Sequence, residues 1–231
     1  YSGATTVSSG TLKLGNSISD IAGLSYRLDA SDTDSLTLSG TNVTAWADAD
    51  GRAVTFSQAA ADLQPVRIAN SINGLPALRF GFSETSKRLI ANAAAAAQTV
   101  FIVNRMTSGA QTHGIWGQSG SDLGIRATSA TEWQHTSNIG NTMDFSYQGE
   151  MYINGVPGTK FVTGVPHILT AVSTNQVNWI AALGHYYTPY ADRFFRGEIG
   201  EVLVFNRVLS LVERQSVTGY LAEKWLGDTS I

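Results

Sequence analysis

The chain has 231 residues, of which 43% are hydrophobic and 14% charged, and this length is sufficient for one domain with a large core. Its 15 basic and 18 acidic residues give a net charge of −3 without any cluster of Lys or Arg, which argues against nucleic acid and anionic membranes as partners. The absence of cysteine excludes disulfides and thiolate metal sites, and no apolar stretch is long enough to span a bilayer.

Residues 1–16 alternate Thr, Val and Leu with Gly, which indicates two short strands. The segment resembles the end of an autotransporter-associated β-strand repeat, and this resemblance implies a long extracellular parent protein. We therefore expect residues 1–18 to be an N-terminal segment and residues 19–231 to be one domain of a larger multidomain chain, which agrees with a start at Tyr1 rather than Met. The alternative is that residues 1–16 form the first strand of the main domain.

Short segments rich in β-branched residues, separated by turn signals, predict strands over most of the chain. Together with their turns, they lie at residues 24–32, 43–48, 73–80, 99–104, 114–118, 123–127, 150–154, 160–162, 167–173 and 177–183. Asn73-Gly74 and Asn154-Gly155 are typical of tight hairpin turns. The alanine-rich run at residues 93–97 is too short to hold a helix unaided, so we interpret it as a connection.

The strongest pattern lies at the C-terminal end of the chain. Residues 202–205 form a fully apolar run that is typical of a strand buried on both faces. A helix is predicted from about residue 210 to 226, because Ser210 and Glu213 have the spacing of a capping box and Gly227 can supply a left-handed C-cap. The residues expected to face inward from this helix are Val212, Val217, Tyr220, Leu221 and Trp225.

Residues 195–225, together with the segments at residues 24–32, 43–48 and 73–80, resemble the LamG-like branch of the concanavalin A-like lectin/glucanase superfamily. The resemblance implies an all-β fold, namely a two-sheet antiparallel jelly-roll sandwich with a C-terminal α-helix. Lectins, carbohydrate-binding modules, hydrolases, lyases and adhesion domains all use this fold, so the resemblance leaves the function open.

Residues 184–193 combine three tyrosines with a histidine, an aspartate and an arginine, and Pro189 favours a loop. Sugars bind to flat aromatic rings and to hydrogen-bonding side chains, so this tyrosine loop is the first candidate for a glycan site. Its candidate ligand-binding residues are His185, Tyr186, Tyr187, Tyr190 and Arg193. The alternative is that the tyrosines cover the rim of the core with their hydroxyls in water.

Trp133 and His135 are two residues apart and share a face of a predicted strand, and Trp179 begins the strand that leads to the tyrosine loop. These three residues are further candidates for ligand binding, with core packing as the alternative for the two indoles. The tryptophans assigned to the core are Trp46, Trp116 and Trp225. The four histidines show no spacing typical of a zinc site.

Two acidic turns offer hard oxygen ligands of the kind that calcium prefers. Their carboxylates are those of Asp29, Asp32 and Asp34 in the first turn and of Asp48 and Asp50 in the second. The superfamily resemblance implies a structural calcium ion at a sandwich edge, without a defined set of ligands. The alternative is that these carboxylates cap neighbouring backbone amides.

Glycoside hydrolysis needs two carboxyl groups that face one another across the sugar. Glu198 and Glu201 are three residues apart, so on a regular strand they would point to opposite faces, and the Glu-x-Asp-x-Glu pattern of hydrolases with this fold is missing. Gln134, His135 and the tyrosines near residues 186–190 supply some residue types of alginate-lyase-like members without the surrounding motifs. We therefore expect no catalytic residues.

The sequence thus predicts a non-catalytic module that binds a polysaccharide or another glycan, outside the cell or on a bacterial surface, within a larger protein. The isolated domain is expected to be a monomer. Two alternatives stay open: an adhesion or spacer domain with a protein ligand or none, and a polysaccharide hydrolase or lyase.

Overall fold

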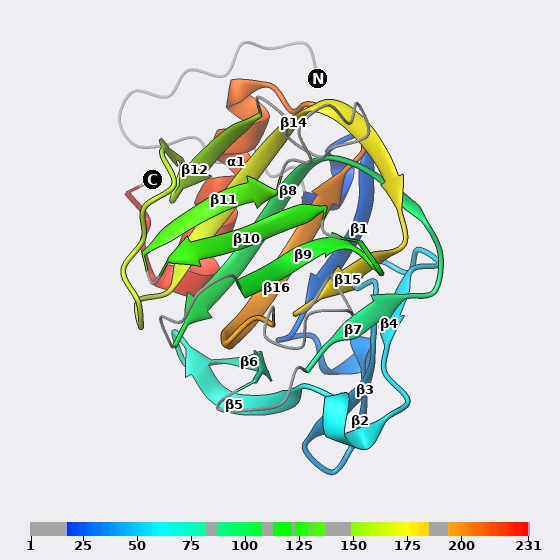
Figure 1. The fold of residues 1–231 in the computed structure, drawn as a ribbon. Coiled ribbons are helices and arrows are strands. Elements are labelled where there is room, and N and C mark those ends of the chain that lie inside the picture. The colour runs from blue at the N-terminus through cyan, green and yellow to red at the C-terminus, as the bar shows by residue number, and fades with distance from the viewer. Residues whose placement is uncertain are drawn as a thin grey trace, which may run out of the picture.

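The computed structural model describes residues 18–81, 87–107, 113–121, 123–129, 131–136, 149–184 and 194–230, without the side chains at positions 113, 135 and 136. These residues form mostly antiparallel strands, with one α-helix near the C-terminal end (Figure 1). The predicted all-β fold with a C-terminal helix is confirmed at this level. The N-terminal repeat-like segment lies outside the described residues except for Ile18, and no described helix is long and apolar enough to cross a membrane.

The strands in chain order are β1 (Leu24–Asp29), β2 (Leu36–Ser39), β3 (Asn42–Ala47), β4 (Thr55–Ser57), β5 (Val66–Ile72), β6 (Leu75–Phe80), β7 (Leu89–Ala91), β8 (Ala95–Met106), β9 (His113–Gln118), β10 (Gly124–Ser129), β11 (Glu132–Thr136), β12 (Glu150–Ile153), β13 (Val156–Pro157), β14 (His167–Trp179), β15 (Ala181–Leu183) and β16 (Gly197–Phe205). The helix α1 spans Leu211–Leu221 and continues into a π-helical turn at Ala222–Leu226. Short 3₁₀ turns lie at Ile18–Asp20, Thr33–Ser35 and Ala61–Leu63.

The strands are hydrogen-bonded in one continuous path, which folds back into two layers. The path runs β11-β10-β9-β15-β7-β4-β3-β5-β6-β16-β8-β14-β12-β13, while β1 pairs with β16 and β2 with β3. Figure 1 shows β9, β10 and β11 in front of β8, β14 and β16, with α1 behind them. The hydrogen-bonded path thus connects β9 of the front layer to β16 of the back layer through β15, β7, β4, β3, β5 and β6.

The core lies between the two layers and is rich in aromatic side chains. Trp116 of β9 stacks on Trp179 of β14, with ring centroids 5.8 Å apart, and donates its indole N–H to the Tyr26 hydroxyl of β1 at 2.8 Å. The assignment of Trp46, Trp116 and Trp225 to the core is confirmed, because each is at most 1% exposed. These contacts hold the front layer against the back layer.

β16 and β8 form the centre of the back layer. All nine residues of β16 are buried, which confirms the strand predicted at residues 202–205 and extends it towards the N-terminus. β8 begins at Ala95, so the interpretation of residues 93–97 as a connection is wrong: residues 95–97 pair with residues 177–179 of β14. Pairing with a long neighbouring strand outweighs the weak local preference of the alanine run.

Both predicted Asn-Gly turns are confirmed. Asn73 and Gly74 join β5 to β6 with φ angles of 49° and 75°, and Asn154 and Gly155 join β12 to β13 with φ angles of 51° and 79°. Two successive positive φ angles are typical of a type I′ turn, which Asn and Gly adopt at low energetic cost.

Two predicted strands differ from the structure. Residues 160–162 form only a single bridge, between Lys160 and Glu132 of β11, and the strand predicted at residues 177–183 is interrupted at the exposed Ile180 between β14 and β15. The remaining predicted strands each overlap a described strand.

The C-terminal helix begins and ends as predicted. The Ser210 hydroxyl accepts from the backbone N–H of Glu213 at 3.3 Å, and the Glu213 carboxylate accepts from the backbone N–H of Ser210 at 2.8 Å. Gly227 ends the π-helical turn with a φ angle of 67°. Val212 is 70% exposed, so its predicted inward position is wrong; it lies about 140° around the helix from Val217. The buried or half-buried members of the predicted face are Val217, Tyr220, Leu221 and Trp225.

The C-terminal turn packs closely against β16 at Gly200. A Cβ atom at this position would lie 2.7 Å from the Trp225 ring, which leaves no space for a side chain. Trp225 also donates its indole N–H to the Glu201 carboxylate at 2.6 Å. The two contacts fix the end of the helical segment on the sheet.

Candidate functional site

Apart from Gly184, the predicted tyrosine loop lies outside the described residues, and so does the side chain of His135. Ligand binding by this part of the chain therefore stays a prediction. The residues concerned are His185, Tyr186, Tyr187, Tyr190, Arg193 and His135.

The other two predicted ligand-binding residues, Trp133 and Trp179, are buried. Trp133 is 1% exposed, donates its indole N–H to Nε2 of His167 at 2.8 Å and packs on Phe161, with ring centroids 5.0 Å apart. Trp179 packs on Trp116 in the core. Neither ring face is open to a sugar from solvent, so the core-packing alternative describes both tryptophans.

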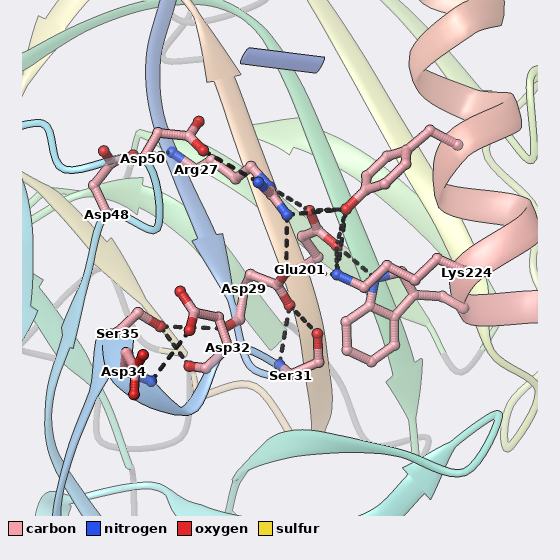
Figure 2. Close-up of polar contacts among 12 residues, drawn as sticks. Arg27, Asp29, Ser31, Asp32, Asp34, Ser35, Asp48, Asp50, Glu201 and Lys224 are labelled. Carbon is pink, nitrogen blue, oxygen red and sulfur yellow. Dashed lines mark hydrogen bonds and ion pairs between the residues drawn. The ribbon is translucent and has the colours of Figure 1, made fainter. Parts of the chain in front are cut away.

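Two carboxylates of the acidic turns, Asp29 and Asp50, belong to a charge network centred on Arg27 (Figure 2). The Arg27 guanidinium contacts three of them: Nε lies 2.8 Å from Glu201, Nη2 lies 2.9 Å from Asp29, and Nη1 lies 3.2 Å from Asp50. Burial alone would lower the pKa of Arg27, but the Glu201 charge and hydrogen bond raise it above its ordinary value. Arg27 therefore stays charged and neutralises carboxylates from three segments of the chain.

Lys224 connects the C-terminal turn to this network. Its ammonium group lies 2.5 Å from Asp29 and 2.7 Å from Glu201, and the Tyr220 hydroxyl also lies 3.0 Å from Glu201. Burial opposes ionisation of Asp29, but the hydrogen bond and charge of Lys224 hold its pKa below the ordinary value. The Tyr220 pKa is raised by burial and by the Glu201 charge, so its hydroxyl stays protonated.

Two further acidic-turn carboxylates, those of Asp48 and Asp32, accept hydrogen bonds from backbone amides. Asp48 accepts from the N–H groups of Arg27 and Arg52, each at 2.6 Å, and Asp32 accepts from the N–H of Asp34 at 3.1 Å. Within the described ranges, no group of three or more His, Asp or Glu side chains is placed to hold a metal ion. The amide-capping alternative accounts for these two side chains, and bound calcium stays a prediction.

A second buried carboxylate, Glu198, lies between two arginines. Its oxygens accept from Arg79 at 2.7 Å, from Arg105 Nε at 2.9 Å and from the Ser71 hydroxyl at 2.7 Å. Burial would raise the pKa of Glu198, but the hydrogen bonds from Ser71, Arg79 and Arg105 lower it below the ordinary value.

Glu198 and Glu201 lie on the same face of the sheet, so the prediction of opposite faces is wrong. Glu198 pairs with Arg105 and Glu201 pairs with Val103, which are two residues apart on β8 and therefore share a face. The register shift at Gly200 inserts one extra residue into β16, as in a β-bulge. Both carboxylates are fully buried, and the lowered pKa of Glu198 is opposite to that of a general acid.

A groove of about 550 Å³ lies between α1, the β12–β13 hairpin and β14. The exposed apolar side chains of Val156 and Leu211 belong to its lining, so the groove faces solvent. None of its described lining residues is an Asp, Glu or His. The polar lining residues are Tyr152, Asn154, Thr170, Arg214, Gln215 and Thr218.

Arg214 and Tyr152 form one wall of the groove. The Arg214 guanidinium lies over the Tyr152 ring, 5.2 Å from its centroid, and donates to the Tyr152 hydroxyl at 3.3 Å and to the Leu209 carbonyl at 2.7 Å. The Tyr152 hydroxyl in turn donates to the Glu150 carboxylate. Burial and this hydrogen bond to Glu150 raise the Tyr152 pKa, so the hydroxyl remains protonated.

The floor of the groove contains a buried hydroxyl without a partner. Thr170 of β14 is 1% exposed, and its Oγ1 has no hydrogen-bond partner. Thr170 pairs directly with Tyr152 across β14 and β12, so both side chains point to the face covered by α1. Sequence reasoning missed this groove because Tyr152 and Arg214 are 62 residues apart and no motif links them.

No protein-family model matches the sequence, and no curated protein matches it. Among solved structures, the chain is similar to Trypanosoma rangeli sialidase in complex with the inhibitor DANA, with 14% identity and a TM-score of 0.51 over 90% of this chain and 34% of that chain. A mutant of T. rangeli sialidase displaying trans-sialidase activity matches with 12% identity and a TM-score of 0.48, over 90% and 34% of the two chains.

The chain thus spans about a third of the length of the solved structures that it matches. At this identity the similarity concerns the fold alone. The LamG-like and β-strand-repeat resemblances find no support from a family model, and what stands is the all-β, mostly antiparallel fold with its C-terminal helix.

Proposed function

We propose that the chain is a non-catalytic carbohydrate-binding module, with the groove between α1 and the β12–β13 hairpin as its binding site. The observation that carries this proposal is the composition of the groove: an aromatic ring, a guanidinium, amides and hydroxyls around one cavity. Protein sites for sugars combine these groups, because a ring packs on the apolar face of a pyranose while polar groups bind its hydroxyls.

Binding is favoured over catalysis by the distribution of carboxylates. The described groove lining includes no Asp or Glu, whereas the paired glutamates of β16 are fully buried and neutralised by Arg and Lys. A glycosidase needs two carboxyl groups that reach the sugar, one of them with a raised pKa.

Two further observations support a carbohydrate-related role. The fold is similar to part of a sialidase, and the layered strands with a C-terminal helix agree with the concanavalin A-like jelly roll that we propose as the finer fold class. We also propose that the module acts outside the cell or on a bacterial surface as part of a larger chain. The tyrosine loop at residues 184–193 is proposed as a second glycan-contacting surface.

A second candidate function is adhesion to a protein partner. Val156, Leu211 and Val212 are exposed apolar residues at or beside the groove, and such side chains are common in protein interfaces.

Native affinity electrophoresis against a panel of soluble polysaccharides tests the proposed function. We expect one class of polymer to retard the protein with a dissociation constant in the micromolar to millimolar range, without release of reducing ends or unsaturated products. Replacement of Tyr152 by Ala should abolish the retardation, because it removes the only aromatic ring among the described groove residues. The same gels with EDTA show whether calcium contributes.

The matched control is the triple variant Tyr186→Ala, Tyr187→Ala and Tyr190→Ala. If this variant loses retardation and Tyr152→Ala keeps it, the tyrosine loop is the site and the groove is not. If no polymer retards the wild-type protein, the carbohydrate proposal fails and adhesion becomes the first candidate.

A further inference from the structure

We infer that the groove selects an acidic sugar, and that Arg214 is the residue that binds the carboxylate or sulfate group of this sugar. The inference rests on the proposed function and narrows its ligand class. Three features of the groove carry it: an arginine without a carboxylate partner, the fixed position of its guanidinium, and an unpaired hydroxyl on the floor.

Arg214 has no carboxylate partner among the described residues. Five other described arginines form ion pairs, for example Arg27 with Glu201 and Arg105 with Glu198. Arg214 contacts only neutral groups, namely the Leu209 carbonyl and the hydroxyl and ring of Tyr152. No described carboxylate forms an ion pair with it, so an anionic group of a ligand can pair with it directly.

The Arg214 guanidinium is held in place before any ligand arrives. One Nη donates to a backbone carbonyl, the other donates to a phenol, and the Tyr152 ring lies against the cation. A planar fork in a fixed position binds carboxylate and sulfate oxygens with little loss of side-chain entropy. The nearby Glu150 carboxylate is engaged by the Tyr152 hydroxyl rather than by Arg214.

The Thr170 hydroxyl indicates that the ligand is a sugar rather than a simple anion. A buried hydroxyl is costly without a hydrogen bond, and Thr170 lies on the floor of the groove with no protein partner. A ligand hydroxyl that reaches the floor would form this hydrogen bond while the acidic group binds Arg214. A sugar acid or a sugar sulfate carries both groups on one small ring.

NMR titration of the ¹⁵N-labelled protein tests the inference with three probes that share one ring: D-glucose, D-glucuronate and D-glucose 6-sulfate. We expect at least one acidic probe to shift the Arg214 side-chain and Thr170 amide signals saturably, at least tenfold more tightly than glucose. The carboxylate and sulfate arms show which group is preferred. Arg214→Gln should reduce binding of the acidic probe to the level of glucose, and Arg214→Lys should restore part of it.

The matched control is Lys160→Gln, which removes one exposed positive charge outside the groove lining and should leave binding unchanged. Valine has nearly the same shape as threonine, so Thr170→Val should weaken the binding of glucuronate several-fold. Binding of acetate, which has a carboxylate but no hydroxyl, should be unchanged in this variant. Thermal unfolding of each variant confirms that it is folded.

Glucose binding as tight as that of both acidic probes would overturn the inference and leave the carbohydrate function intact. The inference would also be overturned if Lys160→Gln lost as much binding of the acidic probe as Arg214→Gln does. The affinity would then depend on the net charge of the protein and not on Arg214. If no probe shifts signals in the groove but a neutral polysaccharide does, the inference fails alone. If neither the three probes nor any polysaccharide shifts the signals of groove residues, the proposed function fails as well.

Discussion

At the scale of single residues, His167 illustrates how burial fixes a protonation state. Its Nε2 accepts from the Trp133 indole, so the neutral ring carries its proton on Nδ1, which faces the Val165 carbonyl at 3.2 Å. Burial lowers the pKa of His167 to about 4, with the Val165 contact acting in the opposite direction. Protonation would require a second donor to face the Trp133 N–H in the core.

The lowered pKa predicts a loss of stability in weak acid. The unfolded chain protonates His167 near its ordinary pKa of 6.5, whereas the folded chain does so only near 4, so stability is lost as the pH falls through this window. Between pH 7.5 and pH 5 the loss is about 2 kcal/mol. Urea unfolding at both pH values measures it.

His167→Gln is the matched variant, because its amide oxygen can still accept from Trp133. The variant should lose the dependence on pH within this window. Carboxylates with a lowered pKa, such as Asp29 and Glu198, lose their stabilising effect mainly as the pH falls below their ordinary pKa values of 3.8 and 4.5, outside this window. An unchanged difference between pH 7.5 and pH 5 in the variant would show that His167 is not the group responsible.

At the scale of elements, the bulge of β16 and the C-terminal turn depend on one another. The extra residue at Gly200 places Glu198 and Glu201 on one face, and the missing side chain of Gly200 admits the Trp225 ring. Glu201 then reaches Trp225 and Lys224, which belong to the turn. A strand without the bulge would point one of the two glutamates to the opposite face of the sheet.

Gly200→Ala should destabilise the protein by about 1 to 3 kcal/mol, because the new methyl group overlaps the Trp225 ring. Chemical denaturation monitored by tryptophan fluorescence measures the change. In a Trp225→Phe background the smaller ring should reduce the cost of the same substitution. An equal cost in both backgrounds would place its origin in the strand rather than in the contact with the turn.

At the scale of the whole molecule, features formed by residues close in the sequence could be predicted, whereas features that depend on distant residues could not. The capping box of Ser210 and Glu213 and the turn at Asn154-Gly155 are encoded within four residues or fewer, and both are confirmed. The bulge escaped prediction because a period-two pattern carries no mark of an inserted residue. The groove escaped it because its walls meet only when α1 packs beside β12.

The ion pair between Lys224 and Asp29 also has a consequence for the order of events during synthesis. The two residues are 195 positions apart, near opposite ends of the described domain. A nascent chain that has not yet emerged beyond α1 lacks the ammonium group and the indole N–H that two nearly or fully buried carboxylates, Asp29 and Glu201, require. Arg27 pairs with both carboxylates before that point, but the network is complete only with the C-terminal turn. We therefore expect the domain to reach its full stability only after these last residues have left the ribosome.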